Sequence, residues 1–134
     1  MGRSGYSDDC DEPAIHLWRG AVAAATRGKR GQQFLHDLVA ALDALPMKRL
    51  VAEELEVNGE VCALGSVGQV RGLQMHDVDP YDSKTVASLF GIAPALAKEI
   101  MFENDEGHWG RETPEARWKR MRAWAIRQLK QVPQ

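Results

Sequence analysis

The residues that could carry nucleophilic catalysis are few and do not form a set. Such catalysis needs a serine, cysteine or threonine beside a histidine that is oriented by an acid. Cys62 stands in the apolar stretch Val-Cys-Ala-Leu, which is typical of a buried small hydrophobic residue. Cys10 lies among acids, whose charge disfavours the reactive thiolate. His36 and Asp43 share the polar side of one expected helix, but no nucleophile stands near them. The sequence therefore predicts no catalytic residue.

The sequence likewise predicts no metal-binding or cofactor-binding motif. The spacing of Asp77, Asp79 and Asp82 lacks the glycine and the final glutamate of a calcium loop, so turn and capping roles are favoured. The acids of residues 103–106 with His108 fit either a cation site or a solvated helix end, and the solvated end is the simpler interpretation. The glycine spacing in residues 65–72 is not that of a dinucleotide-binding loop. We predict no metal and no cofactor; an enzyme stays a third hypothesis, because active sites assemble from distant residues.

The charge of the chain is unevenly distributed along it. The 134 residues carry a net charge of −2. Residues 1–60 hold seven Lys and Arg against ten Asp and Glu, residues 61–110 three against seven, and residues 111–134 seven against two. A basic C-terminal segment is thus attached to an acidic body, and it can bind an anionic partner or fold back on the body itself.

Long apolar runs and cysteines, both of which help to indicate the cellular compartment, are scarce in this sequence. No apolar run approaches the roughly 18 residues that span a bilayer, and residues 1–5 lead into no signal-peptide core. Two cysteines are too few for a disulfide framework, which favours a reducing compartment. We expect a cytoplasmic protein that does not contact a membrane.

The N-terminal half is expected to form an arm and two helices. Residues 1–13 are polar, acidic and glycine-containing, which predicts a flexible arm. Apolar residues at spacings of three and four predict amphipathic helices over 14–27 and 32–45, separated by the basic turn Gly28-Lys29-Arg30-Gly31. Such a short connection favours an antiparallel helical hairpin.

The middle of the chain favours a β-hairpin. Asn58-Gly59 separates two β-prone segments, so a hairpin is expected at about residues 50–64, although residues 52–56 could also extend a helix. Residues 65–72 are expected to be a turn or a short helix.

A helix-turn-helix-like corner is predicted at about residues 83–104. Asp82 is a natural N-cap for a helix over 83–90, Ala87 allows close approach, Gly91 supplies the turn and Ile92 fills the corner. The positions resemble the helix-turn-helix of DNA-binding proteins, but the second helix carries one lysine, Lys98, against four acids. Phosphates would repel it, so we interpret the corner as structural rather than as a DNA reader.

The last helix, about residues 114–131, offers the best binding surface. Thr113-Pro114-Glu115 is typical of a helix start, and Trp118, Met121, Ala125 and Leu129 form one core stripe. The predicted partner-binding residues are four cations on the opposite face, two residues at its edge and two cations of the earlier basic turn: Lys119, Arg120, Arg127 and Lys130; Arg117 and Trp124; Lys29 and Arg30.

Together these patterns predict a mainly α (α+β) fold in which a compact bundle of about five helices carries one small β-hairpin. Residues 14–134 form a single domain behind the arm of residues 1–13.

Several segments distributed over the chain carry a resemblance to other sequences. They are Arg27-Gly-Lys-Arg-Gly31, Ala41-Leu-Asp-Ala-Leu-Pro46, Gly59-Glu-Val-Cys-Ala-Leu-Gly65, Phe90-Gly-Ile-Ala93 and Glu112-Thr-Pro-Glu-Ala-Arg-Trp118. Over nearly its full length the chain resembles small uncharacterised accessory proteins of tailed bacteriophages and prophages of Gram-negative bacteria. The resemblance brings no catalytic motif. It implies a phage context, in the cytoplasm of an infected or lysogenic host, and a protein that binds and modulates, or inhibits, a host or defence component.

The leading hypothesis is therefore a non-enzymatic accessory protein that binds a host or defence protein or nucleoprotein. The alternative is a nucleic-acid-binding regulator that uses the corner and the basic C-terminal helix. Four tryptophans also leave room for a homodimer face.

Overall fold

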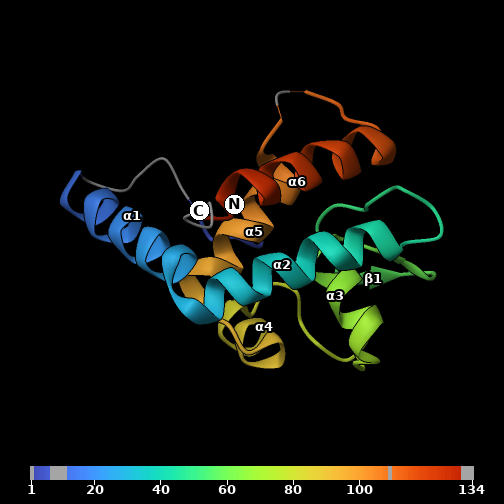
Figure 1. Ribbon diagram of the computed structural model, residues 1–134, viewed down its shortest axis with the longest axis horizontal. Helices are drawn as coiled ribbons and strands as arrows, with labels where there is room; N and C mark the ends of the chain where they lie inside the picture. The colour runs from blue at the N-terminus through green and yellow to red at the C-terminus, as the bar shows by residue number, and fades with distance from the viewer. Residues whose placement is uncertain (1, 7–11, 109, 131–134) are drawn as a thin grey trace.

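The computed structural model of the protein describes residues 2–6, 12–108 and 110–130 (Figure 1). These residues form a mainly α fold with one two-stranded antiparallel sheet, as the sequence predicts. The helices are α1 (Glu12–Arg27), α2 (Lys29–Ala44), α3 (Ala63–Arg71), α4 (Ser83–Phe90), α5 (Pro94–Glu106) and α6 (Pro114–Gln128), and the strands are β1 (Glu56–Val57) and β2 (Glu60–Val61). The described part thus has six helices rather than about five, because residues 63–71 form a full helix.

α1 and α2 make the expected helical hairpin, and a glycine sets their closeness. Gly28 is the only residue between them and is the N-cap of α2. A Cβ at Gly31 would lie 1.9 Å from the carbonyl oxygen of Ala25, so no other residue fits there without a backbone shift. The apolar face of α2, with Phe34, Leu38 and Leu42, is fully buried and packs on α3 and α6.

The β-hairpin is present but shorter than expected. Asn58 and Gly59 have φ values of 52° and 82°, the left-handed conformation that both positions of this turn require. Glu56 pairs with Val61 and Val57 with Glu60. The ladder is short because the flanking chain bonds differently: Cys62 already caps α3, its Sγ accepting a hydrogen bond from the amide of Gly65.

The α4–α5 corner has the geometry of a helix-turn-helix. The two axes are bent by 104°, and Gly91 adopts a left-handed φ of 70° between them. Ala87 and Ile92 are buried in the corner, as the pattern predicts. α5, however, is the central helix of the fold, since it contacts α1, α3, α4 and α6 (Figure 1). Its side chains serve the core rather than an open groove.

Residues 2–6, expected to belong to a flexible arm, are packed against α5. The Arg3 side chain has no exposed surface and donates two hydrogen bonds to Asp105, at 2.6 and 2.9 Å. The Tyr6 hydroxyl donates to Glu99, and its ring packs on Trp18 and Phe102. The buried ion pair is the physical reason for the difference from the prediction, and residues 7–11 of the expected arm lie outside the described residues.

Within the described residues, no single helix is long and apolar enough to cross a membrane. Only α4 and α5 taken together, a sharply bent pair, have the required length and composition.

Gly31→Ala should destabilise the protein by about 1–3 kcal/mol, because the added methyl collides with the carbonyl of Ala25. Chemical denaturation measures the change. Gly20→Ala is the matched control: Gly20 lies in α1 with open space around its Cα, so alanine should stabilise by up to about 1 kcal/mol. Equal effects of the two substitutions would contradict the close approach of α1 and α2.

Arg3→Met should cost about 3–5 kcal/mol, because it keeps the volume but leaves the buried carboxylate of Asp105 without its cation. The same denaturation experiment on Arg19→Met, an exposed position on α1, should show almost no change. If Arg3→Met were equally silent, residues 2–6 would not be docked in solution.

Candidate functional site

The exposed face of α6 is the candidate site, and its own start and core fix its orientation. The hydroxyl of Thr113 accepts a hydrogen bond from the amide of Ala116 at 3.1 Å, and Pro114 occupies the first turn. Met121 and Ala125 are fully buried, and the indole of Trp118 donates to the carbonyl of Leu42 at 2.9 Å. α6 therefore lies against α2 on one side and α5 on the other.

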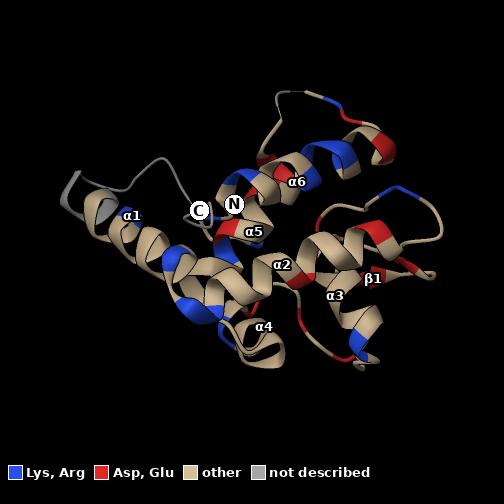
Figure 2. Ribbon diagram, in the orientation of Figure 1, with Lys and Arg blue, Asp and Glu red and all other residues tan. Residues whose placement is uncertain are grey.

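Three of the predicted cations lie on this face as expected. Lys119, Arg127 and Lys130 are exposed, and none of them forms an ion pair within the described residues. Figure 2 shows basic residues along α6 and at the junction of α1 with α2.

The basic residues Lys29 and Arg30, expected in a turn before a helix that starts at residue 32, form the first turn of α2 instead, because Gly28 alone suffices as the connection. This turn is brought to the C-terminal end of α6. The side-chain amide of Gln32 donates to the carbonyl of Gln128 at 3.0 Å and accepts from the backbone amide of Lys130 at 2.8 Å. Lys29 and Arg30, both exposed, stand in the first turn of the same helix as Gln32. The fold thus joins the two basic segments that the sequence analysis treated separately.

Three predicted surface residues point inward instead. Arg120 donates to the carbonyls of Glu103 and Asn104 and forms a two-bond pair with Glu112, at 2.7 and 2.9 Å. Arg117 donates to the carbonyls of Leu50 and Asn104. Trp124, expected at the edge of the exposed face, is only 6% exposed.

The inward direction of these three side chains has a simple geometric cause. A helix on a flat core buries one stripe, but α6 contacts both α2 and α5, so a wider arc of its circumference is covered. Arg117, Arg120 and Trp124 fall on the part of that arc that faces α5. The last turn of a helix leaves backbone carbonyls without partners inside it, and the two guanidinium groups donate to those of Glu103 and Asn104, the first of which also accepts from the amide of Gly107.

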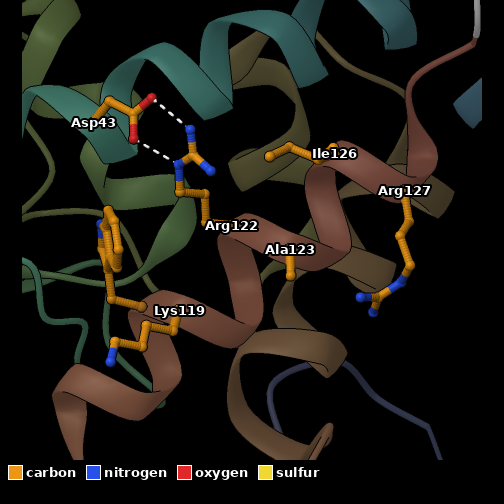
Figure 3. A pocket seen from close by; sticks show the side chains of 7 residues that line it. Asp43, Lys119, Arg122, Ala123, Ile126 and Arg127 are labelled. Atoms are coloured by element: carbon orange, nitrogen blue, oxygen red, sulfur yellow. Dashed lines mark hydrogen bonds and ion pairs between the residues drawn. The ribbon is translucent and has the colours of Figure 1, made fainter.

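The exposed face contains a groove that the sequence analysis missed. It has a volume of about 510 Å³ and lies between α6 and the C-terminal end of α2 (Figure 3). It is lined by apolar and cationic side chains and by one acid: Trp118, Ala123 and Ile126; Lys119, Arg122 and Arg127; Asp43. Ile126 is 42% exposed. The spacing of 119, 122, 123 and 126 on one helix stripe is the signal that could have predicted this face.

Asp43 and Arg122 form a pair across the groove. Two hydrogen bonds, at 2.6 and 3.1 Å, join their side chains (Figure 3). These bonds hold the pKa of Asp43 below its usual value. Both side chains are more than a third exposed, so the pair contributes little to stability and serves mainly to orient Arg122.

The acidic face of α5 is partly covered by other segments. Burial raises the pKa of Glu99 above its usual value, against the effect of the hydrogen bond from Tyr6. Burial and the nearby Glu99 raise the pKa of Glu103, while Arg120 and Arg127 oppose that shift. The negative charge in the middle and at the C-terminal end of α5 is thus already partly buried, and nearby phosphates would add further repulsion.

The remaining candidates for chemistry have structural partners. Cys62 is fully buried, as expected, and its Sγ accepts from Arg3 and the amide of Gly65; Cys10 lies outside the described residues. Asp82 caps α4 and Asp79 accepts from the amide of Tyr81, as predicted. In the part of the chain that the structure describes, no three His, Cys, Asp or Glu residues are arranged to hold a metal ion.

No protein-family model, curated protein or solved structure matches this chain.

Glu112→Gln should lower stability by about 1.5–3 kcal/mol at neutral pH, because the paired bonds to Arg120 lose their charge. Hydrogen bonds from Arg120 hold the pKa of Glu112 below its usual 4.5, so the carboxylate stabilises the fold above that pH and its contribution is lost as the pH falls further. Urea denaturation at several pH values should show the difference between the two proteins shrinking below pH 4.5.

Glu115→Gln serves as the control, since Glu115 is exposed in the first turn of α6 and interacts only with the helix dipole. A Glu112→Gln effect no larger than that of the control would mean that Arg120 is free to face a partner after all.

Proposed function

We propose that the protein is a non-enzymatic binding protein that engages an acidic surface of another protein through the exposed face of α6. The groove between α2 and α6, with an apolar floor and unpaired cations at its rim, carries this proposal. Lys119 and Arg127 would meet carboxylates, while Ile126 and Ala123 would bury apolar side chains of the partner. Lys29, Arg30 and Lys130 extend the positive surface beyond the groove.

The electrostatics of the chain support an acidic partner. The last 24 residues carry a net charge of +5, and the arginines that the fold uses internally are Arg117 and Arg120. Unpaired cations on a surface repel one another and are relieved by binding opposite charge, which also speeds the encounter.

The likeness to small phage accessory proteins supports a host or defence protein as the partner. We propose accordingly that the protein acts in the cytoplasm of an infected or lysogenic bacterium and modulates, or inhibits, that component. A small binding protein without a catalytic set changes its target by occupying a surface, so its effect should depend on its abundance relative to the target.

The first test is capture of partners from a bacterial lysate, with the triple variant Lys119→Glu, Arg127→Glu and Lys130→Glu beside the unmodified protein. We expect proteins captured by the unmodified chain to be lost from the variant, because each reversal places like charges together. The variant leaves Arg120 intact, so that the bonds to Glu112 and to α5 are preserved.

The control reverses two cations elsewhere, Arg19→Glu on α1 and Lys84→Glu on α4, both exposed. It should keep every specific partner. Unchanged capture by the triple variant would remove the α6 face as the binding site.

A nucleic-acid-binding regulator is the second candidate, favoured by the 104° corner and by the cations gathered around Gln32. Binding to duplex DNA at several salt concentrations separates the two functions. Phosphate contacts make affinity fall steeply with salt, and absence of binding at low salt removes this candidate. We expect no binding by α5, because its exposed start carries no arginine and its acids would repel the backbone.

A further inference from the structure

We propose that the groove on α6 is also the docking site for the acidic β-hairpin of a second copy of this chain. This inference rests on the proposed function for its binding surface, the groove on α6. What is new is the element that binds there, the hairpin of a second copy. The chain itself carries an exposed element with the opposite charge and an exposed valine beside its turn, which is the chemistry the groove fits.

The groove offers cations around an apolar patch. Lys119 and Arg127 line the groove together with the exposed side chain of Ile126, and neither cation forms an ion pair in the described residues, although the charge of Arg127 acts on the nearby Glu103. Arg122 is already paired with Asp43, so it forms part of the wall of the groove and adds little unpaired charge. An incoming element therefore needs carboxylates on both sides of a small apolar group.

The hairpin offers that arrangement. Val57 is 40% exposed at the end of β1, next to Glu56, with Glu53 and Glu54 just before it. These three acids form no ion pair in the part of the chain the structure describes, whereas Glu60 of β2 is paired with Arg49. The two-residue turn at Asn58 and Gly59 makes the tip narrow, and Val57 pairs with Glu60 directly across it.

The acids of the hairpin and the cations of the groove do not pair with each other within one molecule. In the described residues no ion pair joins Glu53, Glu54 or Glu56 to Lys119 or Arg127. The charges of both surfaces therefore remain available to a second copy. Contact between two copies brings unpaired charges of both signs together and buries Val57 against Ile126.

Self-association would also regulate the proposed function, because the hairpin of one copy would cover the face that another protein binds. Partner and second copy then compete, and each is favoured under different conditions: the copy at high protein concentration, the partner when the protein is dilute.

The experiment is charge exchange, measured as weight-average mass by sedimentation equilibrium of the full chain at concentrations up to about 1 mM in low salt. The groove variant is Lys119→Glu with Arg127→Glu, and the hairpin variant is Glu54→Lys with Glu56→Lys. The unmodified protein should associate, and each variant alone should associate at least about tenfold more weakly. An equimolar mixture of the two variants should associate again, because acidic groove then meets basic hairpin and acidic hairpin meets basic groove.

The control variant Arg19→Glu with Lys84→Glu should associate like the unmodified protein. Val57→Ser and Ile126→Ser should each weaken association without changing net charge, and added salt should weaken that of the unmodified protein. A monomer at every concentration, or a mixture of variants that stays monomeric, would overturn the proposal.

The two proposals fail independently. Lysate capture is performed with dilute protein, where a second copy does not compete, and sedimentation uses no partner. Loss of capture by the triple variant, with no self-association of the unmodified protein, keeps the proposed function and removes the second copy. Self-association without any captured protein removes the proposed function and keeps the second copy.

Discussion

The C-terminal end of α5 holds the fold together, because four other segments of the chain form hydrogen bonds with it. Asn104 is fully buried; its side chain accepts from the amide of Ala63 at the start of α3 and donates to the carbonyl of Val51. Asp105 binds Arg3 and the amide of Glu53. Arg117 and Arg120 from α6 satisfy the last carbonyls of the helix. A helix end buried in this way needs partners for every polar group, and the sequence supplies them from distant positions.

This arrangement decides which charges remain for a partner. Two of the seven cations after residue 110, Arg117 and Arg120, are used to cap α5, and Arg122 is held by Asp43. Arg111, Lys119, Arg127 and Lys130 are left facing solvent. One face of the basic segment thus folds back on the acidic body, and another face remains exposed to a partner. Both alternatives that the charge pattern left open are therefore realised, by different faces of α6.

Local signals in the sequence placed most elements. Apolar spacing and caps predicted α4 at 83–90 as it is found and α6 from residue 114, and Asn58-Gly59 predicted the turn of the hairpin. These local signals fail where contacts with distant parts of the chain determine the structure. α3 was uncertain because its two glycines disfavour a helix on propensity; Gly65 and Gly68 are tolerated there because the carbonyl of Leu55 and the side chain of Met75 lie where their side chains would otherwise stand. The docking of residues 2–6 has no local signal at all, since it depends on Asp105 more than a hundred residues away.

The sequence by itself determined the types of element, their approximate ends, the buried stripe of α6 and the separation of charge along the chain. Periodicity and capping are local, so they can be read without knowing the neighbours. Tertiary structure alone decided which cations of α6 are free. A helical wheel gives the angle of each side chain but not how many neighbours the helix has, and α6 has two. The same packing created the groove beside Asp43 and carried the turn of Lys29 and Arg30 to the end of α6, which no pattern within either segment contains.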